Sequence, residues 1–130
     1  MILQVGVKVI IRNDEGRYLF LRRSASFKSG AQKWDIPGGR IEPDEALIDG
    51  LKRELREETG LELSKVDALI AAQDIFVEEK DLHVVRLTYL GAATETITLS
   101  DEHDAYKWMT KQEVLAEEVD SYIAAIQDKF

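Results

Sequence analysis

The segment from Gly39 to Leu61, GRIEPDEALIDGLKRELREETGL, constrains the fold of this chain more than any other feature. At about 100° of rotation per residue, its periodicity predicts an amphipathic helix. The apolar stripe of that helix consists of Leu47, Leu51 and Leu55. Glu54 and Glu58 project into the same stripe, where an ordinary amphipathic helix buries aliphatic side chains. The segment therefore predicts a helix with a function beyond packing.

Two interpretations of these glutamates compete. In the simpler one the segment is a surface helix with ion pairs between residues four apart, but the opposite arc already provides a solvated face. That arc contains Asp49, Lys52, Arg53 and Arg56. Buried carboxylates are costly unless they are paired or bind a cation, and glutamates three and four residues apart converge on one point. With Glu57 at the border of the stripe, three oxygen donors without a nearby histidine or cysteine favour Mg²⁺ or Mn²⁺ over zinc.

The residues that flank the helix fit a ligand-binding role. Pro37-Gly38-Gly39 predicts a rigid turn in which no side chain keeps the main chain away from a phosphate or a metal ion. Glu45 is expected in the first helical turn, where a carboxylate caps the unpaired amides. Gly60 is placed for the left-handed residue that closes a helix. The sequence thus predicts a helix over 44–59.

The same segment resembles the Nudix box, G-x5-E-x7-R-E-U-x-E-E-x-G-U, in which U is an aliphatic residue. Every specified position agrees. They are Gly39, Glu45, Arg53, Glu54, Leu55, Glu57, Glu58, Gly60 and Leu61. The resemblance implies an α/β fold, the Nudix-type α/β/α sandwich with a mixed β-sheet, and residues 1–130 are expected to form a single Nudix hydrolase domain.

The resemblance also implies a function. Nudix enzymes cleave the pyrophosphate linkage of a nucleoside diphosphate joined to another group, with divalent cations and an attacking water. By motif position, the metal ligands are expected to be Glu54, Glu57 and Glu58, with the backbone carbonyl of Gly39 as a further ligand. Arg53 lies away from these ligands on the helical wheel, and we expect it to orient a glutamate or brace the loop. The expected cofactor is Mg²⁺ or Mn²⁺.

The general base is left open between two glutamates. Glu54 lies in the box, whereas Glu102 precedes the strand that contains Trp108, where many relatives place a late glutamate. Glu102 is expected to be a metal ligand or the base, and a solvated acidic loop is the alternative. His103 is more simply a loop histidine than a catalyst, and His83 is expected to be structural.

Cations are expected near the phosphates of the substrate. Arg22, Arg23, Lys28, Lys33 and Arg40 all surround the loop before the helix. The better candidates for substrate binding are Arg23, at a strand end, and Arg40, beside the glycines, with Gly38 providing main-chain access. Trp34 and Trp108 are more typical of packing than of base stacking.

The nature of the substrate is less constrained. Markers of the ADP-ribose, dinucleoside polyphosphate and coenzyme A types are absent, which favours a nucleoside triphosphate or a related small nucleotide. An ADP-ribose, nucleotide-sugar or dinucleoside polyphosphate pyrophosphatase remains an alternative, as does a non-hydrolytic domain that senses a nucleotide. An isoprenoid diphosphate isomerase on the same fold needs a catalytic cysteine, and the chain has none.

Composition limits the partners. The net charge of −8 argues against a protein that binds nucleic-acid polymers, because such binding needs clustered Lys and Arg. The start of the sequence lacks the basic region and the long apolar run of a signal peptide, and no stretch approaches the length of a membrane span. A cytoplasmic protein is therefore expected. A homodimer is an expectation by analogy with the family.

Around the box, the pattern predicts short strands and a second helical region. We expect a strand over 4–12, the turn 13–16, and a hairpin partner over 17–23. Further strands are expected over 66–77, 82–90 and 105–109. Thr110 and Glu113 form a capping box that opens a helix, and 119–128 is expected to continue as a helical tail.

Overall fold

The computed structural model of the protein describes residues 1–27, 30–94 and 96–130. The strands are β1 (Ile2–Ile11), β2 (Tyr18–Arg23), β3 (Trp34–Asp35), β4 (Gly38–Arg40), β5 (Leu63–Val77), β6 (Leu82–Ala93) and β7 (His103–Met109). The helices are α1 (Leu47–Thr59), α2 (Lys111–Ala116) and α3 (Ser121–Ala124), with 3₁₀ turns η1 (Glu78–Lys80) and η2 (Gln127–Lys129). None of the described helices has the length and apolar character needed to cross a membrane.

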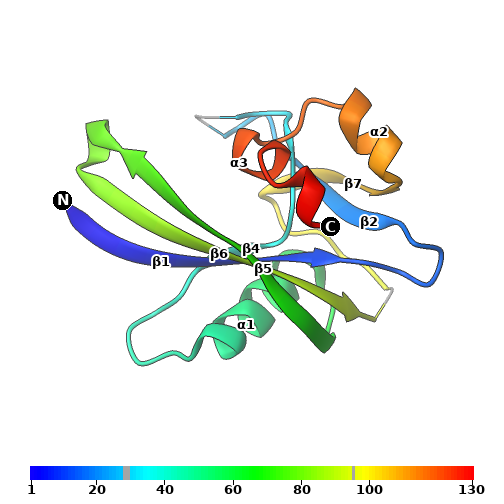
Figure 1. The fold of residues 1–130 in the computed structure, drawn as a ribbon, viewed down its shortest axis with the longest axis horizontal. Coiled ribbons are helices and arrows are strands. Elements are labelled where there is room, and N and C mark those ends of the chain that lie inside the picture. The colour runs from blue at the N-terminus through cyan, green and yellow to red at the C-terminus, as the bar shows by residue number, and fades with distance from the viewer. Residues whose placement is uncertain (28–29, 95) are drawn as a thin grey trace.

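The strands form two sheets. The larger has the order β4-β1-β6-β5 and the smaller the order β3-β2-β7. β1 runs parallel to β6, from Ile2 beside Leu82 to Ile11 beside Gly91, whereas β4 and β5 are antiparallel to their neighbours. Helix α1 lies on one side of the larger sheet, and α2 and α3 lie on the other (Figure 1). The predicted α/β/α sandwich with a mixed sheet is confirmed.

The predicted hairpin between the first two strands is wrong. β1 has β4 on one edge and β6 on the other, so it offers no edge to β2, which pairs with β3 and β7 instead. An isolated antiparallel bridge from Arg12 to Tyr18 is the contact that remains of the hairpin. The turn itself is as predicted, because the Asn13 side chain accepts hydrogen bonds from the amides of Glu15 and Arg17.

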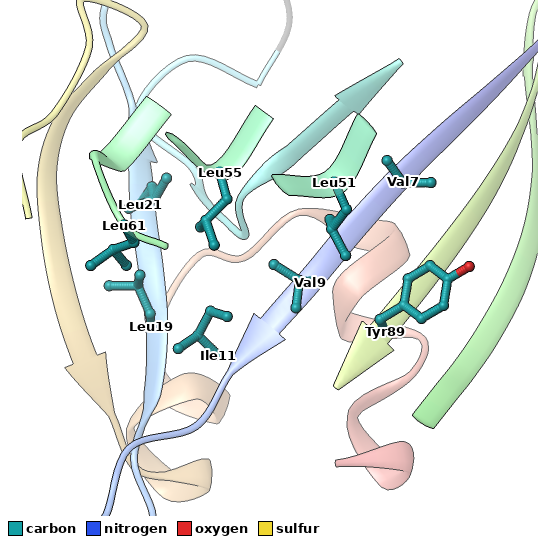
Figure 2. Packing of buried hydrophobic residues seen from close by; sticks show 9 residues of the cluster. All are labelled: Val7, Val9, Ile11, Leu19, Leu21, Leu51, Leu55, Leu61 and Tyr89. Atoms are coloured by element: carbon teal, nitrogen blue, oxygen red, sulfur yellow. The ribbon is translucent and has the colours of Figure 1, made fainter. Parts of the chain in front are cut away.

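The core beneath α1 explains the position of the helix. Alternation along β1 points Val7, Val9 and Ile11 to one face, where they meet Leu51 and Leu55 of α1. Figure 2 shows the two leucines directed into this cluster, which also contains Leu19, Leu21, Leu61 and Tyr89. A second cluster, on the side of α2 and α3, contains Ile10, Tyr18, Phe20, Ile36, Met109, Val114, Ile123 and Ile126.

The start of α1 differs from the prediction. The helix begins at Leu47 rather than at Asp44, because Asp44 has a left-handed φ of 65° and forms a turn with Pro43. Leu47, taken as the first residue of the apolar stripe, is 37% exposed. The other end is as predicted, since Gly60 has a φ of 72° and its amide donates to the Arg56 carbonyl.

The remaining elements follow the predicted order. β5 and β6 pair along their length around η1, which confirms the two predicted strands. Thr110 and Glu113 form the predicted capping box of α2. The expected helical tail is instead a short helix, α3, capped by the Asp120 side chain, and a 3₁₀ turn.

Candidate active site

The side chains of Glu54, Glu57 and Glu58 on α1 differ in their exposure to solvent. Their side chains are 7% exposed at Glu58, 18% at Glu54 and 59% at Glu57. Together with residues 100–102, they line a pocket of about 280 Å³. The structure therefore brings Glu102 beside the three predicted ligands of the box, although 44 residues separate it from Glu58 in the sequence.

Backbone hydrogen bonds hold the turn at 100–102 against the helix. The amide of Ser100 donates to the Glu58 carbonyl at 3.0 Å, and the amide of Ser24 donates to the Glu102 carbonyl at 3.0 Å. Because both bonds involve main-chain atoms, the position of this turn depends on the fold and only weakly on its own side chains. Glu102 itself is exposed.

Two glycines bring the main chain against these carboxylates. A Cβ atom on Gly39 would lie 2.5 to 2.7 Å from the carboxyl atoms of Glu54. Gly38 has a φ of 145°, which disfavours L side chains, and its amide donates to Glu58 Oε1 at 2.7 Å. The predicted turn is instead a bend at Pro37 that leads into strand β4, whose first two residues are Gly38 and Gly39. Because these two residues have no side chains, the main chain can still approach the carboxylates closely, as the sequence suggested.

Glu58 is a buried carboxyl group among other acids. Burial raises its pKa to about 8, the carboxylates of Glu54 and Glu102 act in the same direction, and the charge of Lys8 and the Gly38 amide oppose them. Burial also raises the pKa of Glu54. A divalent cation favours the charged form of a nearby carboxyl group, so this set of hard oxygen donors fits a divalent metal ion.

Arg53 connects the loop before α1 to the glutamates. Its guanidinium donates to both carboxylate oxygens of Glu45, at 2.7 and 2.9 Å, to Glu54 Oε1 at 3.0 Å and to the Arg40 carbonyl at 3.1 Å. It also lies 3.4 Å from Glu57 Oε2. Arg53 is half-buried and lies between the loop and the carboxylates, whereas the helical wheel placed it on the solvated arc.

The predicted capping role of Glu45 is wrong. Ala46 is the N-cap residue of α1 and receives no side-chain cap, because Glu45 instead binds Arg53. The hydrogen bonds from Arg53, together with the Glu42 amide, lower the pKa of Glu45 to about 2. Gly50 makes room for this pair, since a Cβ there would lie 2.9 Å from Glu45 Oε1. The spacing of the Nudix box pointed to Glu45 but did not indicate that Arg53 is its partner.

Arg23 differs from the expectation that it reaches a substrate phosphate. Its side chain is 13% exposed and donates to Asp35 Oδ2 at 2.8 and 3.2 Å and to Asp120. Lys8 also binds Asp35, at 3.2 Å, and Arg86 binds Asp120, at 3.3 Å. The guanidinium of Arg23 is thus engaged in an internal ion-pair network between β1, β2, β3, β6 and α3.

The other predicted cations lie in different surroundings. Arg40 is exposed at the end of β4, and Arg22 pairs with Asp104 at 2.8 Å. Lys33 is partly buried, and Lys28 lies outside the described residues.

The structure also defines the surroundings of the two tryptophans and the two histidines. Trp34 and Trp108 pack against the two hydrophobic clusters. His83 binds Asp74 at 2.7 Å and stacks on Phe76 in the sheet. His103, by contrast, lies in the acidic site, with Nδ1 at 4.0 Å from Glu58 Oε2.

A second pocket of about 250 Å³ lies on the opposite face of the larger sheet from α1. Its lining includes Lys8, Gly39, Arg40 and Arg86 beside the apolar side chains of Ile75, Val77 and Val84. Gly39 connects the two pockets, since it lines this one and contacts Glu54 of the other. Lys8 and Arg86 are not recognisable as site residues from the sequence, because each is a single cation in an apolar strand pattern. Their place in one pocket depends on the register of β1 and β6.

An α/β/α sandwich with glutamates of one helix gathered against two glycines of a short strand defines a recognisable class of proteins. The MutT protein from Methanosarcina mazei Go1 has this fold, with a TM-score of 0.84 and 30% identity over 97% of this chain and 91% of that protein. The sequence pattern of the NUDIX domain matches residues 2–129. The chain belongs to the NUDIX domain family, as the resemblance implied.

Two relatives by sequence carry functional names. Nucleoside triphosphatase NudI from Escherichia fergusonii is 27% identical in an alignment of length 114 that covers 81% of this chain and 80% of NudI. The m7GpppN-mRNA hydrolase NUDT17 from Bos taurus is 43% identical over 61 residues, which are 47% of this chain and 20% of NUDT17. The matched part of this chain thus spans about a fifth of the length of NUDT17.

Proposed function

We propose that this protein is a metal-dependent pyrophosphohydrolase that acts on a nucleoside triphosphate or a related small nucleotide. The observation that supports this most directly is the carboxylate cluster of Glu54, Glu57, Glu58 and Glu102, joined through Gly39 to a pocket with cationic and apolar walls. The resemblance to NudI over most of both chains favours a triphosphate. The net charge of −8 favours a small nucleotide over a polymer.

Each part of the site has a task in this proposal. Glu54, Glu57 and Glu58, with the Gly39 carbonyl, hold a divalent cation, for which Mg²⁺ is the first candidate and Mn²⁺ the second. When bound, such a cation neutralises phosphate charge and lowers the pKa of a coordinated water. Gly38 fixes Glu58 through its amide, and Arg53 fixes Glu54.

The nucleotide is proposed to occupy the second pocket. Arg40, at its exposed rim, is placed to meet the phosphates. Lys8 and Arg86 are paired with Asp35 and Asp120, but with Arg23 this network holds three cations and two carboxylates, so it leaves net positive charge at the floor. Ile75, Val77 and Val84 offer apolar surface to the nucleoside. Glu54 and Glu102 remain the two candidates for the general base, since both line the acidic pocket.

The test is a substrate panel. Phosphate and pyrophosphate release from nucleoside triphosphates, ADP-ribose, dinucleoside polyphosphates and nucleotide sugars is measured with Mg²⁺, with Mn²⁺ and with EDTA. We expect turnover of triphosphates that requires metal and falls by about 10² or more in Glu57→Gln, the scale of losses when charge stabilisation is removed. Glu79→Gln, in the exposed turn η1, is the matched control and is expected to retain full turnover.

Two results contradict the proposal. Turnover that persists in EDTA or in Glu57→Gln excludes the carboxylate cluster as the metal centre. Absence of turnover across the panel, with a nucleotide that still raises the melting temperature, favours a nucleotide-sensing domain over an enzyme.

A further inference from the structure

The imidazole of His103 is buried at the acidic site. The residue is 6% exposed, and its Nδ1 atom makes no hydrogen bond within the described part of the chain. Glu58 Oε2 lies 4.0 Å from Nδ1, well beyond the about 3.2 Å of a hydrogen bond. Because an unpaired buried polar atom is costly, Nδ1 is expected to have a ligand that is not part of the protein.

The distances around His103 suit a shared cation. One donor atom from each of Glu58, Glu102 and His103 lies within 4.8 Å of the other two. Two ligands about 2.1 Å from one cation are about 3.0 Å apart when adjacent and about 4.2 Å apart when opposite. The 4.0 Å between Nδ1 and Glu58 Oε2 falls in this interval. The donor atoms must come closer together to share a cation, and Glu102 can make this movement because it is exposed and has a long side chain.

Two of these three donors are held in place before any ligand binds. Glu58 is fixed by the Gly38 amide at 2.7 Å. His103 opens β7, pairs with Arg23 of β2 across the smaller sheet, and packs against the ring of Phe27 at 6.2 Å between centroids. Donors fixed by the fold lose little conformational entropy when they bind a metal ion.

We propose that His103 Nδ1 is a direct metal ligand, so that Glu58, Glu102 and His103 form a mixed oxygen and nitrogen site. The inference rests on the proposed function for its catalytic meaning, but metal binding alone tests it. Imidazole favours Co²⁺, Ni²⁺ and Zn²⁺, whereas Mg²⁺ prefers oxygen. The site is therefore expected to bind Co²⁺ more tightly than an all-oxygen site does.

Electron spin-echo modulation of bound Mn²⁺, without nucleotide, detects a coordinated imidazole nitrogen directly. The chain has two histidines, so His83→Gln leaves His103 as the one imidazole. We expect the nitrogen modulation in the wild type and in His83→Gln, and its loss in His103→Asn, whose side-chain oxygen takes the place of Nδ1. By calorimetry, His103→Asn is expected to raise the Kd for Co²⁺ by about tenfold or more, with a much smaller change for Mg²⁺.

The outcomes separate this inference from the proposed function. Mn²⁺ bound to wild type and His83→Gln without nitrogen modulation overturns the role of His103 and leaves the hydrolase proposal intact. If the wild type binds none of Mn²⁺, Co²⁺ and Mg²⁺, the role of His103 and the proposed function are both overturned. If His103→Asn does not fold, as judged by circular dichroism, the spectra of the wild type and His83→Gln still decide the question.

Discussion

The main chain of Gly39 lies directly against the carboxylate of Glu54. The closest approach of a Cβ atom built on Gly39 would be 2.5 Å to the carboxyl carbon, which is far inside van der Waals contact. Because the carboxylate of Glu54 is the end of a flexible side chain, a methyl group on residue 39 is expected to displace this carboxylate and leave the backbone in place. Gly39 of strand β4 thus determines where the carboxylate of Glu54 in α1 lies.

Gly39→Ala is therefore expected to keep the fold and to reduce turnover by about 10² or more, as for other losses of a positioned charge. Gly16→Ala is the control. Gly16 has a φ of 74° in an open turn, so a side chain there costs about 1 kcal/mol of stability without touching the site. Steady-state kinetics and urea unfolding of both variants separate the two effects, and full activity of Gly39→Ala would contradict the role given to the close approach.

Arg53 is expected to act by holding Glu54 and Glu45 in position. Arg53→Lys keeps the charge but cannot form the two-pronged contact with Glu45, so turnover is expected to fall by about 10 to 100-fold. Arg56 provides a matched control, because it makes the same fork to Glu62, at 2.8 and 2.9 Å, on the exposed side of α1. Arg56→Lys is expected to change neither turnover nor metal affinity. Equal kinetics of the two variants would show that Arg53 has no positioning role.

The packing of α1 can be tested with two leucines of the same predicted stripe. Leu55 is fully buried, and Leu47 is 37% exposed. Leu55→Ala is expected to lower the free energy of unfolding by about 2 to 5 kcal/mol, because it leaves a cavity in the core. Leu47→Ala is expected to change it by less than about 1 kcal/mol. Chemical denaturation measures both, and similar losses in the two variants would contradict the observed start of the helix.

The sequence was most informative where function depends on local spacing. Glu54, Glu57 and Glu58 lie on one helix, so their convergence follows from helical geometry alone. Gly60 and the capping box of Thr110 and Glu113 were likewise predictable from their immediate neighbours.

Features that depend on distant strands were not predictable in the same way. Lys8 and Arg86 line the same pocket because β1 and β6 are parallel neighbours, with Gly6 opposite Arg86 and Lys8 opposite Thr88. No local sequence pattern predicts that pairing of strands. The hairpin prediction failed for the same reason, since the edges of β1 were occupied by later strands. The burial of His103 was not predictable either, because it depends on the pairing of β7 with β2 and on the neighbouring Glu58 of α1.

The internal network around Asp35 predicts how stability depends on pH. Burial alone would raise the pKa of Asp35, but the charges of Lys8, Arg23 and Arg86 and the Ile36 amide hold it well below its usual range. A carboxyl group with a lowered pKa in the folded state stabilises the protein above its unfolded pKa, about 3.9, and this stabilisation is lost as the pH falls.

At neutral pH, Asp35→Asn removes one partner of a buried network, which costs about 3 to 5 kcal/mol. Urea unfolding between pH 7 and pH 3 is expected to show a large difference between wild type and variant at neutral pH and a shrinking one below about pH 4. A difference that stays constant over this range would show that the Asp35 charge does not contribute to the stability of the fold.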